Sequence, residues 1–171
     1  MKQSELPPRP PLYLFFDENC SPLLAAELQD FFRSDYEQES SKLVITHIQS
    51  SLEKGLKDTD WTKMLSKDPW IIFTEEKSKA KEQNALVVVC KELGLTHVLI
   101  KNTLSKRADQ KEGICQAWKF IRILPYLPKG TEVRLTNHHA KGGLAIASIH
   151  IGNQRLDNWC QKEGINIPSM N

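Results

Sequence analysis

Acidic and amide side chains stand at several points of the chain where an apolar segment ends or a helix is expected to begin. They are Asp17, Glu18, Asn19, Asp58, Asp60, Glu75, Glu76 and Asn102. Carboxylates that converge from different segments repel one another unless a cation or a proton lies between them. Oxygen ligands select hard cations such as Mg²⁺ or Mn²⁺. These residues therefore predict a metal site, and such an ion could activate water for phosphodiester hydrolysis.

Most of these acids also have a structural explanation. Asp58 has the side chain of a helix N-cap residue, and Asp60 would interact favourably with the dipole at a helix N-terminus. Glu75 and Glu76 precede several lysines, as expected of a solvated surface loop. Asp17 is the hardest to explain structurally, because it directly follows a strand-like apolar segment.

Apolar periodicity predicts strands that alternate with helices up to residue 124. The expected strands are Leu12–Phe16, Leu43–Ile48, Trp70–Phe73 and Val98–Ile100. The expected helices begin at Pro22, begin at Asp58, span Glu82–Leu93, and run through Ile114, Ala117, Trp118, Ile121 and Leu124. This alternation predicts an α/β domain with a largely parallel sheet. The acids would then gather at the carboxyl ends of its strands, where such sheets bind ligands.

Two further patterns concern the first helix and the tail of the chain. In the helix that begins at Pro22, the spacing predicts one apolar face made of Leu24, Leu28, Phe31 and Phe32. In the tail, Glu132–Asn137 and Leu144–Ile151 alternate as strands of a hairpin, and Leu156–Lys162 is expected to be a final helix. His138 and His139 would lie at the exposed tip of this hairpin, where a solvated role is favoured over catalysis.

The charge of the chain is unevenly distributed. The net charge is only +2, but residues 1–60 hold 11 acidic against 6 basic residues, and residues 101–134 hold 8 basic against 3 acidic residues. An acidic cluster beside a basic face is what a metal-dependent enzyme acting on a polyanion needs. The candidate contacts to RNA phosphates are Lys101, Lys106, Arg107, Lys111, Lys119 and Arg122. A solvated helix face is the alternative explanation of this basic set.

Length and composition limit the other possibilities. The chain has 171 residues, of which 40% are hydrophobic and 26% charged, as in an ordinary globular protein with a core of its own. No apolar stretch approaches the roughly 18 residues needed to cross a bilayer. Residues 1–11 read as a disordered lead-in without the features of a signal peptide. The four cysteines form no C-x-x-C pair, so we expect reduced thiols, a cytoplasmic location and no membrane contact.

Three segments of the chain resemble motifs of PIN-like domains related to VapC-type toxin ribonucleases. Residues 14–22 (LFFDENCSP) resemble the strand and DEN-x-SP opening of that group. Residues 55–61 (GLKDTDW) are similar to its G-x-x-D-x-x-W segment, and residues 70–75 (WIIFTE) to its apolar strand that ends in Thr followed by an acid. The order and spacing of the three agree, and the resemblance covers about residues 12–124.

The resemblance implies a three-layer α/β/α sandwich, an Mg²⁺ or Mn²⁺ cofactor and endonucleolytic hydrolysis of RNA. By position it implies Asp17, Asp58 and Glu75 as catalytic acids. The implied metal ligands are Asp17, Asp58, Asp60, Glu75 and Glu76, and Glu18, Asn19 and Asn102 are further polar candidates. The chain departs from the pattern at Glu75-Glu76, where Thr-x-Asp is expected. Because glutamate is one methylene longer than aspartate, its carboxylate reaches a different position.

Two functions are compatible with this pattern. The first is a ribonuclease toxin of a toxin–antitoxin pair, with RNA as substrate, an antitoxin protein as partner and a possible homodimer. The alternative is a catalytically silent PIN-like module that binds RNA or a protein, which the departure at Glu75-Glu76 favours. In both cases we expect a PIN-like domain over residues 12–124, with a C-terminal hairpin and short helix over residues 125–171 packed on it.

Overall fold

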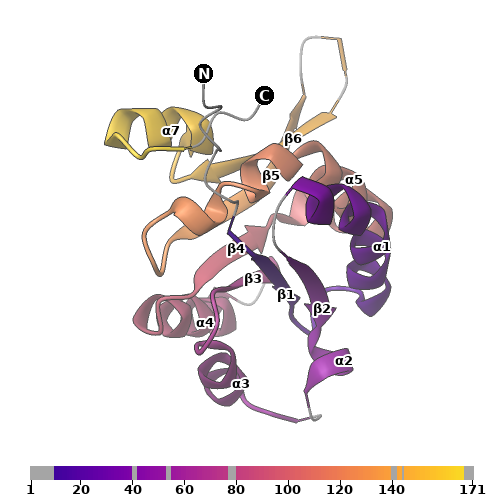
Figure 1. The fold of residues 1–171 in the computed structure, drawn as a ribbon, viewed down its shortest axis with the longest axis vertical. Helices are drawn as coiled ribbons and strands as arrows, with labels where there is room; N and C mark the ends of the chain where they lie inside the picture. The colour runs from indigo at the N-terminus through magenta and orange to yellow at the C-terminus, as the bar shows by residue number, and fades with distance from the viewer. Residues whose placement is uncertain are drawn as a thin grey trace, which may run out of the picture.

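The computed structural model describes residues 10–39, 42–52, 55–76, 80–139, 142–143 and 145–167. The strands are β1 (Leu12–Phe16), β2 (Leu43–His47), β3 (Trp70–Glu75), β4 (Thr96–Ile100), β5 (Glu132–His139), β6 (Ala145–Ile151) and β7 (Gln154–Arg155). The α-helices are α1 (Pro22–Glu39), α2 (Ile48–Ser51), α3 (Asp58–Leu65), α4 (Ala80–Glu92), α5 (Arg107–Gln116), α6 (Trp118–Ile121) and α7 (Leu156–Glu163). Two 3₁₀ helices, η1 (Asn102–Leu104) and η2 (Leu124–Tyr126), complete the crossover from β4 to β5. Figure 1 shows helices on both sides of a twisted central sheet.

The described strands form one sheet in the order β2-β1-β3-β4-β5-β6-β7. The first five strands run parallel, and β6 and β7 are antiparallel to their neighbours. The predicted α/β fold with a largely parallel sheet is confirmed. The predicted hairpin of β5 and β6 extends this sheet, because β5 pairs with β4 as a fifth parallel strand.

The two faces of the sheet have separate hydrophobic cores. Alternate residues of β1 divide between them: Leu14 and Phe16 belong to the larger core, and Phe15 belongs to the smaller one. The larger core lies under α1, α5, α6 and α7, and the smaller core lies under α3 and α4. In the smaller core the rings of Phe15 and Trp61 stack with centroids 5.3 Å apart. This stacking fixes α3, and therefore Asp58, against β1.

Two expectations about the helices on the larger core were wrong in detail. Phe31 is 58% exposed, whereas Leu24, Leu28 and Phe32 are buried. At 100° per residue Phe31 lies at the margin of the buried face of α1, so it meets the solvent. The single helix expected through Leu124 is broken at Ala117, whose φ of −88° and ψ of 4° end α5 before α6 begins.

Four smaller findings concern the remaining expectations. The N-cap of α3 is Lys57, so Asp58 is the first helical residue rather than the cap. β5 runs through His139, so His138 lies in a strand and not at a hairpin tip. The four cysteines are free thiols. None of the helices in the described ranges is long and apolar enough to cross a membrane.

Candidate functional site

The strand order reverses direction between β1 and β3. The chain passes from β1 outward to β2 on one side and then returns to β3 on the other side. In open α/β sheets the carboxyl ends at such a reversal diverge into a crevice that binds ligands. Asp17 follows β1 there, and its backbone N–H donates to the carbonyl of Phe73 on β3 at 3.1 Å. Glu75 ends β3 two residues later.

The carboxyl group of Asp17 is buried, with 5% of the residue exposed. Asn19 holds both of its oxygens: the backbone N–H donates to Oδ1 and the side-chain amide to Oδ2, each at 3.0 Å. Burial raises the pKa of Asp17 to about 7, although the hydrogen bonds from Asn19 and Cys20 lower it, and the charge of Asp58 raises it further. Burial and the negative charge of Asp58 both disfavour the ionised form of this carboxyl group, so its position is a favourable place for a cation.

Asp58 reaches the same edge from the first turn of α3. Its Oδ1 accepts a hydrogen bond from the indole Nε1 of Trp61 at 3.0 Å, and its carbonyl accepts one from the hydroxyl of Thr62. Trp61 and Thr62 are buried, so both bonds hold the first turn in place. Asp58 itself is exposed, and its charge acts on Asp17 and on Cys90. Asp60 is exposed two residues further into the helix.

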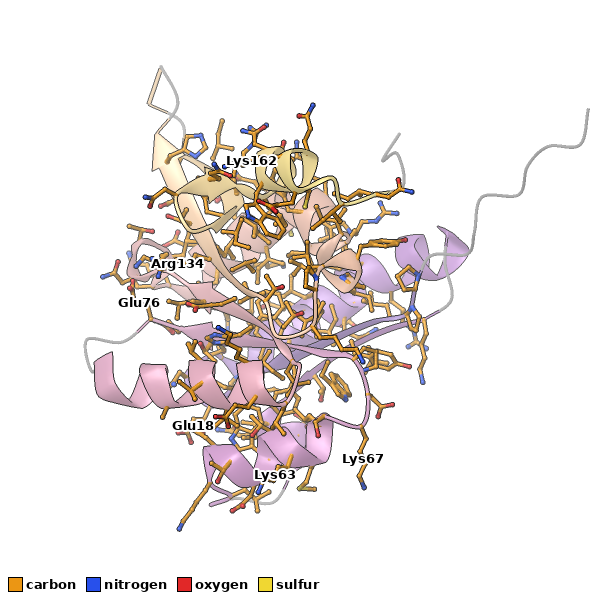
Figure 2. The ribbon with its side chains drawn as sticks, turned by 90° about the vertical axis from the view of Figure 1, so that its left-hand side faces the viewer. Glu18, Lys63, Lys67, Glu76, Arg134 and Lys162 are labelled. Atoms are coloured by element: carbon orange, nitrogen blue, oxygen red, sulfur yellow. The ribbon has the colours of Figure 1, made fainter. Side chains whose placement is uncertain are left out.

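Glu75 and Glu76 lie in different electrostatic surroundings. The charges of Glu75 and Asp17 both raise the pKa of the Cys20 thiol, after burial as the main cause, so Glu75 lies on the same side as Asp17. Glu76 instead forms an ion pair with Lys101 and accepts a hydrogen bond from the backbone N–H of Asn102 at 3.1 Å. Burial alone would raise the pKa of Glu76, but these two contacts and the charge of Arg134 lower it. Figure 2 shows Glu76 and Arg134 close together at this edge of the sheet.

The carboxylates therefore divide into two sets. Asp17, Asp58 and Glu75 act on one another or on shared neighbours, whereas Glu76 faces Lys101. Within the part of the chain that the structure describes, no group of three or more His, Cys, Asp or Glu side chains is close enough to hold a metal ion. Mg²⁺ commonly binds through one or two carboxylates and keeps its remaining ligands as water or substrate phosphate. Asp17 and Asp58 match that smaller ligand set.

His47 is a residue of this edge that the sequence analysis did not identify. It ends β2, is 1% exposed, and its Nδ1 accepts a hydrogen bond from the backbone N–H of Gln49 at 3.1 Å. Nε2 therefore carries the proton and donates a hydrogen bond to the carbonyl of Cys20 at 2.8 Å. This bond ties β2 to the turn of residues 17–20. Within that turn, the backbone N–H of Cys20 donates a hydrogen bond to the carbonyl of Asp17 at 3.1 Å. The only sequence signal for a role of His47 was its place at the end of a segment with strand-like alternation.

A second buried histidine lies behind Glu75. His97 Nε2 and the hydroxyl of Thr74 are 2.7 Å apart, and both residues are buried. Burial lowers the pKa of His97 to about 4, so its imidazole is neutral near pH 7. Its Nδ1 has no hydrogen-bond partner among the described residues. The pair fixes the side chain that immediately precedes Glu75.

The six predicted RNA-binding residues do not form one patch. Lys101 pairs with Glu76, while Arg107 and Lys111 lie 3.9 and 3.8 Å from the carboxylate of Glu27 on α1. Lys106 is exposed at the N-cap of α5, on the same edge as the acids. Lys119 and Arg122 come later on the crossover, which must return to the amino edge of the sheet because β4 and β5 are parallel. The structure thus separates Lys119 and Arg122 from the acids.

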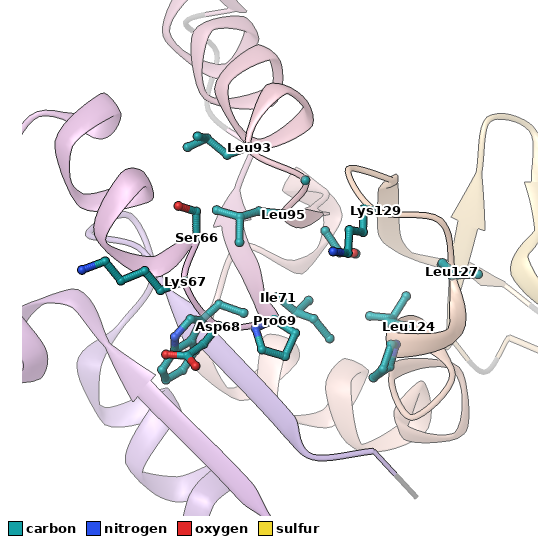
Figure 3. A pocket seen from close by; sticks show the side chains of 14 residues that line it. Ser66, Lys67, Asp68, Pro69, Ile71, Leu93, Leu95, Leu124, Leu127 and Lys129 are labelled. Atoms are coloured by element: carbon teal, nitrogen blue, oxygen red, sulfur yellow. The ribbon is translucent and has the colours of Figure 1, made fainter.

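A pocket of about 260 Å³ lies at the amino edge, away from these acids. Figure 3 shows Ser66, Lys67, Pro69 and Ile71 on one side of it, with Leu124 and Lys129 facing them. Its lining comes from the beginnings of β3 and β4 and from η2. The pocket therefore contributes no residue to the carboxylate edge.

The segment of the chain that carries these acids matches a known protein family. A family model described as "PIN like domain" matches residues 13–102, which include Asp17, Asp58 and Glu75. No curated protein and no solved structure matches the chain.

Proposed function

Because the chain belongs to the family of PIN-like domains, we propose that it is a metal-dependent endoribonuclease that hydrolyses the phosphodiester bonds of RNA. The main support is the environment of Asp17, a buried carboxyl group at the strand reversal that lies within electrostatic reach of Asp58. Keeping its charge buried without a counter-ion is unfavourable, and a bound cation removes that cost. PIN-like domains are often nucleases, which agrees with this chemistry.

In this proposal Asp17 and Asp58 hold Mg²⁺ or Mn²⁺, and Glu75 assists them. The ion supplies Lewis-acid polarisation of the scissile phosphate and a bound water of lowered pKa. Asn19 keeps the Asp17 carboxylate in one orientation through its two hydrogen bonds. Asp60 is a candidate for a second, outer contact, and Glu18, which is also exposed, for a contact to substrate. Glu76 has the separate role of neutralising Lys101.

The chain's own basic residues bind the substrate in this proposal. Lys106 at the start of α5 is exposed and lies at the carboxyl edge with the acids. Arg107 and Lys111 follow on the same helix and share Glu27. Long, exposed pairs of this kind are weak, so they can release to RNA phosphates. Lys119 and Arg122 are left out of the proposed contact.

We extend the proposal to a role as the toxin of a toxin–antitoxin pair, with an antitoxin protein as partner. The support is the resemblance of residues 14–22 to the opening of the VapC-type group. Co-expression with a neighbouring small gene product tests it: relief of growth inhibition is expected, and equal growth without the partner would contradict the toxin role. Size-exclusion chromatography with light scattering tests the possible homodimer.

The decisive experiment is cleavage of a mixed RNA pool with Mn²⁺ or Mg²⁺. Wild-type protein is compared with protein in EDTA, with Asp17→Asn, and with Asp30→Asn as a matched control. Asp30 is an exposed aspartate on α1, so its variant makes the same chemical change away from the site. Cleavage that needs both metal and Asp17 is expected. Equal cleavage by Asp17→Asn and the wild type would exclude Asp17 from the mechanism.

Two observations favour a second function, a catalytically silent PIN-like module. No three-residue metal group occurs among the described side chains, and Lys101 already neutralises Glu76. Such a module binds RNA or a protein without cleaving it. Titration calorimetry with Mn²⁺ separates the two functions: a nuclease has a site that is lost in Asp17→Asn, and a silent module has none.

A further inference from the structure

Every polar group of Cys20 makes a hydrogen-bonding contact at the carboxyl edge of the sheet. Its backbone N–H donates to the carbonyl of Asp17 at 3.1 Å, and its carbonyl accepts from Nε2 of His47 at 2.8 Å. Its Sγ lies 3.8 Å from the carbonyl oxygen of Phe73 on β3. The residue is buried, with 3% exposed. Cys20 is therefore a buried link between the ends of β1, β2 and β3.

The thiol of Cys20 also contacts the carboxyl group of Asp17. Burial raises the pKa of Asp17, and the thiol opposes that rise by donating a hydrogen bond to its carboxyl group, as Asn19 does. Burial and the charges of Asp17 and Glu75 raise the pKa of the thiol itself. The sulfur therefore keeps its proton and is a hydrogen-bond donor at neutral pH.

The Asp17 carboxylate thus has three hydrogen-bond donors on its own turn. The backbone N–H of Asn19 donates to Oδ1 and its side-chain amide donates to Oδ2, each at 3.0 Å. The thiol of Cys20 is the third donor. A carboxylate offers about four lone-pair directions to its surroundings. Because three donors use three of them, the carboxylate keeps one direction for a cation.

We infer that Cys20 is a positioning residue of the carboxylate edge, whose thiol fixes the orientation in which Asp17 presents its remaining lone pair to a divalent cation. The inference rests on the proposed function, because a fixed orientation matters only when Asp17 is a metal ligand. The alternative is that Cys20 only fills space in the larger core, to which it belongs. Filling space needs no proton on the side chain, so the two explanations differ in which substitutions preserve function.

The first test compares Cys20→Ser, which keeps a donor, with Cys20→Ala, which removes it. Cleavage is measured at saturating RNA and Mn²⁺, and Mn²⁺ affinity by calorimetry, on proteins that urea unfolding shows to be folded. Cys20→Ala should lower kcat about tenfold and change the Mn²⁺ affinity less than about threefold, because a misoriented ligand acts on the reaction geometry. Cys20→Ser should keep kcat within about threefold of the wild type, because its hydroxyl replaces the lost donor.

The matched controls are Cys160→Ser and Cys160→Ala. Cys160 is a 1% exposed cysteine of the same core and lies on α7. Both control variants should leave kcat unchanged. Equal kcat values of Cys20→Ala and Cys20→Ser would overturn the positioning role alone. Absence of metal-dependent cleavage by the wild type would instead overturn the proposed function, and the inference with it.

A second measurement uses the metal-free protein and needs no substitution of Cys20. The S–H stretching band of a thiol moves to lower frequency when the thiol donates a stronger hydrogen bond. Infrared spectra are recorded in EDTA at pH 8, where the carboxyl group of Asp17 is ionised. The band of Cys20 should move to higher frequency in Asp17→Asn, because a neutral acceptor replaces a charged one. Asp30→Asn should leave the band unchanged, and an unchanged band in Asp17→Asn would overturn the inference even when RNA is cleaved.

Discussion

The imidazole of His47 donates a hydrogen bond to the carbonyl of Cys20 across 2.8 Å. His47 ends β2 and Cys20 closes the turn after β1, so the bond joins the ends of two neighbouring parallel strands. The same turn begins at Asp17, whose carbonyl accepts from the N–H of Cys20. The position of the buried carboxyl group therefore depends on a side chain 30 residues away in the sequence.

Removing the hydrogen-bonding groups of His47 should disturb the site more than the fold. In His47→Leu the carbonyl of Cys20 loses its buried donor, which costs about 1–3 kcal/mol of unfolding free energy. We expect at least a tenfold loss of cleavage, measured at saturating RNA and Mn²⁺. His47→Gln can still donate to Cys20 and should recover most of the activity. Equal activities of the Leu and Gln variants, at equal stability, would exclude a positioning role.

Asp17→Asn should abolish cleavage and also stabilise the metal-free protein at pH 8. The unfolded carboxyl ionises near pH 3.8 and the folded one near 7, so the folded state binds the extra proton between these values. The free energy of unfolding therefore falls as the pH rises from 4 to 7, and the neutral asparagine escapes this loss. Urea unfolding in EDTA at pH 8 should show a gain of about 2–4 kcal/mol.

The control for this measurement is the pH series itself. The gain in Asp17→Asn should shrink as the pH is lowered to 4, where the wild-type carboxyl is protonated in the folded state. In the variant, the side-chain amide of Asn19 must rotate to present its oxygen to the new NH₂ group. Asp30→Asn should leave stability nearly unchanged at every pH. A gain that is independent of pH would show that burial of the Asp17 charge is not its cause.

The acids at the strand ends were predictable because each stands next to an apolar run in the sequence. Asp17 after Leu12–Phe16 and Glu75 at the end of Trp70–Glu75 needed only strand periodicity and the rule for parallel sheets. The pairing of Glu76 with Lys101 was not predictable, because it depends on the register of β3 against β4. Long-range register leaves no local trace in the sequence.

The crossover between β4 and β5 was predicted as one helix for a related reason. Ile114, Ala117 and Ile121 keep helical spacing across the break, because α5 and α6 contribute to the same core. The conformation of Ala117 ends α5 on the path by which the chain returns to the start of β5. Apolar periodicity alone does not predict this break. The basic residues of this segment were predicted as one patch because they are close in sequence. They are separated in the fold because the crossover returns the chain to the amino edge of the sheet.

Removing Lys101 should strengthen metal binding. The ammonium group neutralises Glu76 at the end of β3, and Lys101→Ala releases that carboxylate beside Glu75. Calorimetric titration with Mn²⁺ should give a roughly three- to tenfold higher affinity, since a further anionic oxygen becomes available to a hard cation. The double variant Lys101→Ala, Glu76→Gln should lose this gain. An unchanged affinity in Lys101→Ala would mean that Glu76 lies outside the metal site.

His97 should make the protein sensitive to acid between pH 6.5 and 4. Burial holds its folded pKa at about 4, whereas the unfolded imidazole titrates near 6.5, so the unfolded state binds more protons in this range. The contribution of His97 is fully present above pH 6.5 and is lost as the pH falls through 4, with a size of about 3 kcal/mol. His97→Gln cannot take up this proton and can still donate to Thr74. Its free energy of unfolding, measured with urea from pH 7 to 4, should therefore fall less steeply than that of the wild type, and parallel curves would contradict the assignment.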